Sequence, residues 1–323
     1  MLIKNLIMRL VMPVADIVMS PLTFVFACQM KVIRRLSLQN MPVSRSIFQS
    51  LGMLPVTTHY YDPMIVPNML NHPLDQVRKL PGIDLNMTAQ LERLCGYGYQ
   101  SELMAIPLDD QGDGQFYYRN GAFGAGDGEI LYSVIRHSKP KMLIEIGGGF
   151  STLMAQKAIV QNIVEDESYT CRHICIEPYE YQWLDKLDVE VIRERVEDVD
   201  ASLFSQLGQD DILFIDSSHM IRVQGDVLVE YLEILPTLNS GVMVHIHDIF
   251  TPRDYPSRWV FEAMLLWNEQ YLLEAFISQN ENYEVMLSLN HLFHDHKDAL
   301  NLACPVLNSE SGPEPGSFWI IRP

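Results

Sequence analysis

The stretch that decides the fold is Met142-Leu-Ile-Glu-Ile-Gly-Gly-Gly-Phe-Ser-Thr152. Residues 142–146 form a short apolar run of the length of a buried strand. Gly147, Gly148 and Gly149 follow it and allow a tight turn against which a ligand can press closely. The sequence LMAQKAIV then predicts a helix. Strand, glycine turn and helix in this order are typical of the beginning of a nucleotide-binding βαβ unit.

The residues around the glycines indicate which ligand this turn serves. A dinucleotide fingerprint would have a third glycine where Thr152 stands. Glu145, at the end of the strand, would repel a pyrophosphate and attract a cation. S-adenosylmethionine carries a sulfonium and an ammonium group, so this turn favours S-adenosylmethionine over a nicotinamide dinucleotide. We include Ser151, in the same turn, among the predicted cofactor contacts.

Two further predicted strands end in acidic residues. Residues 173–177 form an apolar strand that closes with Glu177, a position from which a carboxylate can accept both ribose hydroxyls of a nucleoside. A third strand over residues 189–192 is followed by Glu197, which is a candidate for the adenine edge. The alternative for Glu197, a solvated helix start, stays open.

The fourth and fifth predicted strands bring together four side chains capable of acid–base or metal chemistry. Asp216 and His219 follow the strand at 212–215, and His247 and Asp248 close the strand at 242–246. In a parallel sheet both ends face the crevice in which ligands bind. Asp216 and Asp248 could hold Mg²⁺ together with water and substrate hydroxyls, with His219 as general base. His247 would favour Mn²⁺ over Mg²⁺ as the bound ion. In the alternative, Asp216 contacts the cofactor and no metal enters.

These motifs resemble those of the class I S-adenosylmethionine-dependent methyltransferases. EIGGGFST stands where that family has its first motif and CIEPY where it has its second. The resemblance covers residues 127–323 and implies an α/β, Rossmann-like, seven-stranded sheet with helices on both faces and an antiparallel last strand. The late strands that match lie at 212–215, 242–246, 283–289 and 318–321. The D-x-x-H spacing is similar to that of metal-dependent sugar O-methyltransferases, which have an acidic residue where His247 stands.

The charge of the chain is unevenly distributed. The 323 residues contain 23 Lys and Arg against 41 Asp and Glu, a formal net charge of −18, which argues against a nucleic-acid-binding role. Residues 1–50 nevertheless contain six basic side chains and one acidic one, and the apolar run 10–30 is bracketed by basic residues. We predict that residues 1–36 associate with an anionic membrane surface on its cytosolic side. Whether this segment spans the membrane, lies on it or docks on the protein's own core is left open.

The chain therefore divides into a membrane-associating segment (1–36), an irregular helical cap (37–126) and a methyltransferase domain (127–323). We predict O-methylation of a sugar, a polysaccharide intermediate or another small hydroxylated acceptor, with S-adenosylmethionine and an Mg²⁺ or Mn²⁺ ion. Arg253 and Tyr255, just after the fifth strand, are the predicted acceptor contacts. The alternatives are a non-catalytic, membrane-associated scaffold that binds a nucleoside and an NAD-dependent oxidoreductase. Calorimetric titration with the two cofactor classes separates them.

Overall fold

The computed structural model describes residues 2–112, 114–179, 181, 183–310 and 312–323, with side-chain burial given from residue 11 onward. By its internal contacts the chain divides into two compact units, Met1–Asn71 and His72–Pro323. The sequence-based division at residues 36/37 and 126/127 separates segments by their predicted functions, and it stays a prediction.

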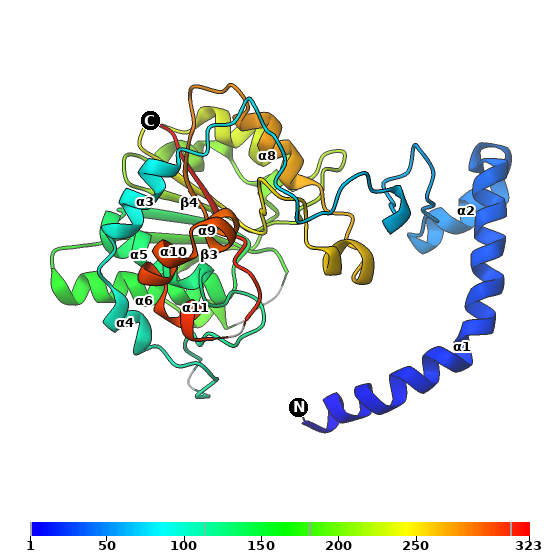
Figure 1. Ribbon diagram of the computed structural model, residues 1–323, viewed down its shortest axis with the longest axis horizontal. Coiled ribbons are helices and arrows are strands. Elements are labelled where there is room, and N and C mark those ends of the chain that lie inside the picture. Colours follow the sequence, from blue (N-terminus) through cyan, green and yellow to red (C-terminus); the bar gives the residue numbers. More distant parts are fainter. Residues whose placement is uncertain (1, 113, 180, 182, 311) are drawn as a thin grey trace. The chain divides into compact units, whose positions relative to one another are not determined.

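The first unit is built on a long helix, α1 (Leu2–Leu36), which is followed by the short helix α2 (Pro42–Leu51) (Figure 1). Pro13 and Pro21 lie inside α1. Ile33 of α1 and Phe48 of α2 are the buried apolar side chains among the described residues of this unit. Residues Val11–Leu36 are long and apolar enough to cross a membrane by length and composition alone. One such helix near the N-terminus is weak support for a membrane span.

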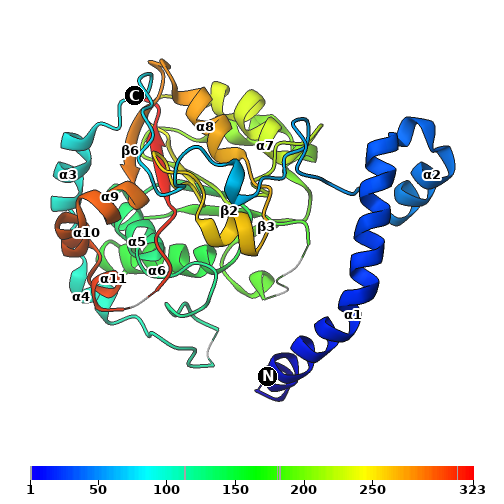
Figure 2. The same cartoon turned by 45° about the vertical axis from the view of Figure 1, so that its right-hand side comes forward.

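The second unit contains a seven-stranded sheet in the order β3-β2-β1-β4-β5-β7-β6 (Figures 1 and 2). Neighbouring strands from β3 to β5 pair in parallel, and β7 is antiparallel to both β5 and β6. Because β1 lies between β2 and β4, the connections reverse direction there, which is the point where ligands bind in open α/β sheets. The strands are β1 (Met142–Ile146), β2 (Arg172–Ile176), β3 (Glu190–Ile192), β4 (Ile212–Ile215), β5 (Met243–Ile246), β6 (Glu284–Ser288) and β7 (Phe318–Ile321).

Helices cover both faces of this sheet, and alternate side chains of each strand enter two separate apolar clusters. Leu143 and Phe214 pack with α5 and α6 in the first cluster, whereas Ile144 and Leu213 pack with α7 and α8 in the second. The strands are apolar at nearly every position because both faces are buried. The helices of this unit are α3 (Met87–Cys95), α4 (Gln100–Met104), α5 (Asp127–Ser138), α6 (Phe150–Glu165), α7 (Asp226–Val229), α8 (Glu269–Ile277), α9 (Leu289–Asp295), α10 (Lys297–Ala303) and α11 (Pro305–Ser309).

The predicted fold class is confirmed: the sheet has seven strands, helices on both faces and an antiparallel β7. Each predicted strand is present, with ends that differ by at most one residue. Asp127 lies in the first turn of α5, and its carboxylate accepts hydrogen bonds from the backbone N–H groups of Gly316 and Ser317. That carboxylate therefore holds the segment that leads into β7.

Candidate active site

A cavity of about 370 Å³ lies at the carboxyl ends of β1, β2 and β4. Four of the predicted cofactor-binding residues line it, namely Gly147, Glu177, Glu197 and Asp216. They come from four different segments of the chain, and the parallel register of the strands brings them to one edge of the sheet. The other polar side chains that line this cavity are Tyr179, Arg195, Ser217, Ser218, Arg222 and Asp226.

The glycine turn is shaped by two close approaches. Gly147 has φ +85°, and a Cβ atom there would lie 2.0 Å from the carbonyl oxygen of Asp216. Its N–H donates to the carbonyl of Ile176 at 3.0 Å, which ties the turn to the end of β2. At Gly148 a Cβ would lie 2.1 Å from Sγ of Cys175. Both glycines are therefore required for the strand ends to meet.

Glu177 is held against this turn. Its Oε2 accepts a hydrogen bond from the Gly148 N–H at 3.3 Å, and its Oε1 accepts from the Tyr179 N–H at 2.9 Å. Glu197 lies at the far side of the cavity, 3.5 Å from the guanidinium of Arg222. These two acids face the cavity from the positions that the sequence predicts.

The other four predicted cofactor residues, Glu145, Gly148, Gly149 and Ser151, do not line the cavity. Glu145 is fully buried, and its Oε2 lies 3.0 Å from Nε2 of His173. Gly149 donates its N–H to Oγ1 of Thr152 at the start of α6, and Ser151 is buried in the first turn of that helix. Contact of Glu145, Gly148, Gly149 and Ser151 with the cofactor stays a prediction.

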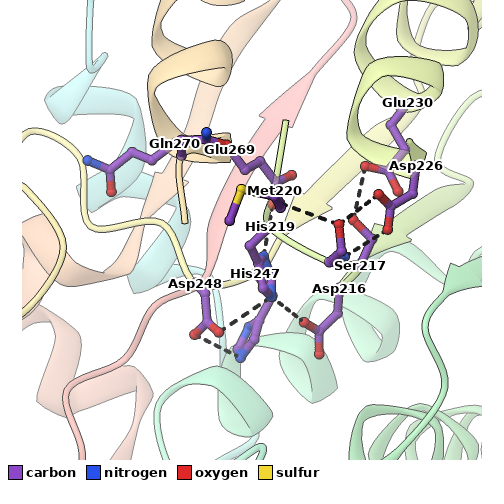
Figure 3. A network of polar contacts seen from close by, with 12 residues as sticks. Asp216, Ser217, His219, Met220, Asp226, Glu230, His247, Asp248, Glu269 and Gln270 are labelled. Atoms are coloured by element: carbon purple, nitrogen blue, oxygen red, sulfur yellow. Dashed lines mark hydrogen bonds and ion pairs between the residues drawn. The ribbon is translucent and has the colours of Figure 1, made fainter. Parts of the chain in front are cut away.

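The catalytic residues predicted from the fourth and fifth strands do converge (Figure 3). Nε2 of His219 lies 3.2 Å from Oδ1 of Asp216 and 3.6 Å from Oδ2 of Asp248. One ligand atom from each of the three side chains can be chosen so that all lie within 4.8 Å of one another. His219 and Asp248 have φ of +57° and +58°, a left-handed conformation uncommon for residues other than glycine and typical of functional sites.

The other ring nitrogen of His219, Nδ1, contacts a buried carboxylate on the side away from the two aspartates. Nδ1 lies 2.8 Å from Oε2 of Glu269, which is fully buried at the start of α8. The remaining carboxylate oxygen of Glu269 accepts a hydrogen bond from the Tyr231 hydroxyl at 3.0 Å. This pairing places the proton on Nδ1 and leaves Nε2 directed at the two aspartates.

The charged groups in this cluster shift one another's pKa values. Desolvation raises the pKa of Asp216, but the nearby His247 and His219 outweigh it and lower that pKa to about 2. For His219, burial acts to lower the pKa, and hydrogen bonds to Asp216 and Glu269 raise it well above its ordinary value. Burial raises the pKa of Asp248 to about 6, against the opposing charges of His247 and His219.

His247, a predicted metal ligand, has a different position from the other three. Its Nε2 lies 3.6 Å from Oδ1 of Asp248, and its Nδ1 lies 3.4 Å from Nε2 of His245. The ring is buried against Phe123, 5.1 Å between centroids. Among the described residues, the group that could hold a metal consists of Asp216, His219 and Asp248. His247 stands beside that group, and its coordination of a metal stays a prediction.

The predicted acceptor contacts are engaged elsewhere. Arg253 is buried and donates to Asp295 at 2.9 Å, and the buried hydroxyl of Tyr255 accepts from the Gln270 N–H at 3.1 Å. The ring centroid of Trp267 lies 4.4 Å from that of His219, so Trp267 is next to the reactive cluster.

Sequence reasoning missed Glu269 and Glu230. Glu230 is fully buried and accepts from the Ser217 hydroxyl at 3.1 Å. Neither residue is part of a local motif, since each reaches the site from a helix on the same face of the sheet. The available signal was weak, because each is an acidic residue in a helical stretch that is mostly apolar, DVLVEYLEI for Glu230 and EQYLLEAFI for Glu269.

Comparisons with known proteins agree with the fold and the glycine turn. Residues 144–249 match a family model described as a methyltransferase domain. An uncharacterised protein of Archaeoglobus fulgidus is 29% identical over 182 residues, which are 52% of this chain and 80% of that protein.

Solved methyltransferases are among the structures to which this chain is similar. The plantazolicin methyltransferase BpumL is 13% identical, with a TM-score of 0.37, and covers 74% of this chain and 96% of its own. TomG, an O-methyltransferase from Streptomyces achromogenes, is 14% identical, with a TM-score of 0.36, and covers 72% and 89%. Likeness at this level carries no information about the acceptor.

The match over residues 144–249 begins within β1, includes the glycine turn and ends just past Asp248. It therefore spans every strand whose end lines the cavity or carries the reactive cluster. Residues 144–249 are therefore similar to a methyltransferase domain, and they lie in a seven-stranded sheet whose last strand, β7, is antiparallel.

Proposed function

We propose that this domain transfers the methyl group of S-adenosylmethionine to a hydroxyl oxygen of a small or glycan acceptor, with the help of a divalent cation. The observation that carries the proposal is the convergence of Asp216, His219 and Asp248 beside the cavity at the strand ends. Asp216 belongs to both places, because it lines the cavity and contacts His219. The reacting groups would therefore meet next to Asp216.

The cofactor side of the proposal rests on the cavity residues. Glu177 and Glu197 both line the cavity, and we assign Glu177 to the ribose hydroxyls and Glu197 to the adenine edge. Changing Glu177 to Gln should weaken binding of S-adenosylhomocysteine about tenfold, as expected when a hydrogen bond to a charged group is lost. Glu190→Gln is the matched control, because Glu190 also lies beside β2 but pairs with Arg172 outside the cavity. Equal losses in both variants would contradict the assignment.

The donor set fits a divalent cation. Two carboxylates and one imidazole suit Mn²⁺, Fe²⁺ or Zn²⁺ better than Mg²⁺, which prefers oxygen alone. Glu269 supplies the hydrogen bond to the far ring nitrogen that metal-binding histidines usually make. When bound, such an ion would lower the pKa of the acceptor hydroxyl. We therefore propose Asp216, His219 and Asp248 as the ligands, with His247 beside them.

A side chain of the protein must also accept the proton of the acceptor hydroxyl. The acceptor oxygen forms a bond to the methyl carbon as the sulfur–methyl bond breaks, and the hydroxyl loses its proton. Nε2 of His219 cannot hold a metal and accept this proton at once, so the assignment of His219 as general base applies only without a metal. With a metal bound, we assign the proton to a free oxygen of Asp248, because Asp216 faces the cavity of the cofactor.

The test measures the formation of S-adenosylhomocysteine with a panel of hydroxylated acceptors that includes nucleotide sugars, oligosaccharides and phenols. We expect turnover with at least one class, loss of turnover in excess chelator, and recovery with Mn²⁺. Asp248→Asn should lower kcat at least a hundredfold and leave binding of S-adenosylhomocysteine within about threefold. Full turnover in chelator would remove the metal from the proposal, and His219 would again be the candidate base.

The location of the enzyme is a separate part of the proposal. Lys31, Arg34, Arg35 and Arg45 lie on the C-terminal side of the apolar run, against Lys4 and Arg9 on the other side. Excess basic residues mark the cytosolic side of a membrane segment. We therefore propose that the catalytic unit is held at the cytosolic face of a membrane, where it reaches acceptors attached to lipid.

A further inference from the structure

A second cavity lies within the first unit, and the proposed methyl transfer does not use it. It has a volume of about 1030 Å³ and lies between the C-terminal part of α1 and the segment 57–62. Cys28, Lys31, Val32 and Arg35 line it from α1 at helical spacing, so one face of that helix forms its wall. Thr57, Thr58, His59, Tyr61 and Asp62 close the other side.

The segment opposite α1 is fixed in place by one carboxylate. Asp62 pairs with Arg34 of α1 and accepts hydrogen bonds from the N–H and the hydroxyl of Thr57 at 3.1 and 2.7 Å. These contacts close residues 57–62 into a turn that lies against the helix. The cavity is thus formed by specific contacts and not by a chance gap between two segments.

The charge of this cavity favours an anion. Three cationic side chains line it, Lys31, Arg34 and Arg35, and Asp62 is the one carboxylate among its lining residues. Asp62 is paired with Arg34, so the charges of Lys31 and Arg35 are not matched by an acid of the cavity wall. Hydroxyl groups of Thr58 and Tyr61 add hydrogen-bond donors. This combination suits a phosphate group.

The surroundings indicate where such a phosphate would come from. The apolar run of α1 ends at Met30, one residue before Lys31, so the cavity begins where the apolar part of the helix stops. Tyr60 and Tyr61 are 91% and 85% exposed, and tyrosines of this kind gather at the level of lipid headgroups. Val43, Ile47 and Leu51 form an exposed apolar face of α2 at spacing i, i+4, i+8. These three features suit a cavity at a membrane interface, an argument that rests on the membrane association proposed above.

We propose that this cavity binds the phosphate headgroup of an anionic membrane lipid. Lys31 and Arg35 contact the phosphate, while the acyl chains follow the apolar surface of α1 and α2. The proposal goes beyond the methyltransferase activity, since it assigns a lipid site to the other unit of the chain. It requires neither the cofactor nor the metal.

The test uses the full chain in a neutral detergent, titrated calorimetrically with dioctanoyl phosphatidic acid. Separate arms use dioctanoyl phosphatidylcholine and inorganic phosphate. We expect one phosphatidic acid per chain and binding at least tenfold weaker in each of the other arms. Lys31→Gln and Arg35→Gln should each weaken phosphatidic acid binding about fivefold, the size expected for one cation near a lipid surface.

Arg45→Gln is the matched control, because Arg45 is an exposed cation of α2 in the same unit and does not line the cavity. It should change binding less than twofold. An equal loss with Arg45→Gln would mean general attraction by charge and would overturn the proposal. Equal binding of phosphatidylcholine, equal binding of inorganic phosphate, or no binding at all would also overturn it. Titration of the same samples with S-adenosylhomocysteine tests the catalytic unit independently.

Discussion

The carboxylate of Glu269 lies 2.8 Å from Nδ1 of His219, although the two residues are fifty positions apart in the chain. His219 follows β4 and Glu269 begins α8, so the contact joins a strand end to a helix on the same face of the sheet. The backbone repeats this connection, because the N–H groups of Asn268 and Glu269 both donate to the carbonyl of His219. The orientation of the imidazole is therefore fixed by the helix that follows the reactive cluster.

We expect Glu269→Gln to lower kcat between about tenfold and a hundredfold, the usual effect of losing a hydrogen bond behind a metal-binding histidine. An amide can present its N–H₂ or its oxygen to Nδ1, so the ring no longer has one fixed tautomer. Steady-state kinetics give kcat, and calorimetry with Mn²⁺ gives the metal affinity. Binding of S-adenosylhomocysteine should change less than threefold, because Glu269 does not line the cofactor cavity.

Tyr231→Phe is the control for this prediction. The Tyr231 hydroxyl donates to the other oxygen of Glu269, so its removal leaves the contact with His219 in place. We expect a smaller loss in kcat, below about fivefold. If Tyr231→Phe lowered kcat as much as Glu269→Gln, the loss would come from disruption of the buried hydrogen-bond network as a whole. The orientation of His219 would then not be its specific cause.

Glu230 predicts a dependence of stability on pH. Burial, with the charges of Glu269 and Asp226 nearby, raises the pKa of Glu230 well above its ordinary value. The folded state therefore holds this proton more tightly than the unfolded state. The stability that the protonated carboxyl contributes is complete below the unfolded pKa of about 4.3 and is lost as the pH rises toward the folded pKa.

Glu230→Gln carries no titrating group, so it should remove this loss. The free energy of unfolding of the variant, relative to the parent, should rise with pH by up to about 1.4 kcal/mol per pH unit between the two pKa values. Urea denaturation between pH 4.5 and 8 in excess chelator measures it. Parallel curves for the two proteins would show that Glu230 is ionised throughout this range.

Much of the sheet could be predicted because each strand is a short apolar run bounded by polar residues or glycines. Asp216, His219 and Asp248 could be placed together because parallel strands end at one edge of the sheet. Glu269 could not, since only the packing of α8 brings it to His219. Sequence patterns predict which side chains lie at the end of a strand. They do not predict which side chain of a packed helix will contact them.

Glu145 illustrates a different limit. Its position before the glycines indicated a side chain that faces the ligand, but the register of the sheet decides what it meets. Glu145 lies beside Cys175 on β2, and His173 is two residues earlier on the same face of that strand. The carboxylate therefore reaches Nε2 of His173. No pattern within β1 contains this information.

The turn after β1 gives a prediction about stability. A Cβ atom at Gly148 would lie 2.1 Å from Sγ of Cys175 and 3.1 Å from Cδ1 of Leu184. Both neighbours are fully buried, so neither can move freely. We expect Gly148→Ala to lower the free energy of unfolding by about 1–3 kcal/mol, the range for overpacking a buried site.

A second substitution tests this cause. Cys175→Ala removes the sulfur atom, so the double variant Gly148→Ala/Cys175→Ala should be more stable than the sum of the single changes predicts. Urea denaturation of the four proteins provides the coupling energy. Strict additivity would show that the loss at Gly148 comes from the backbone and not from the contact with Cys175.

The apolar run of α1 gives the final prediction, about how the chain is attached to membranes. Val14, Ile17, Val18 and Phe24 are each at least 61% exposed, so the first unit does not bury them itself. A helix that spans the bilayer resists extraction with alkaline carbonate, whereas a helix in the interface is released. Since Val11–Leu36 is long enough to span, we expect the full chain to stay in the membrane pellet and a variant lacking residues 1–36 to appear in the supernatant.

Release of the full chain by carbonate would instead place α1 in the interface. A shortened variant that stays in the pellet would contradict membrane attachment through this helix altogether, and a variant with Lys4 and Arg9 changed to Gln, which keeps the apolar run intact, is the control for effects of charge.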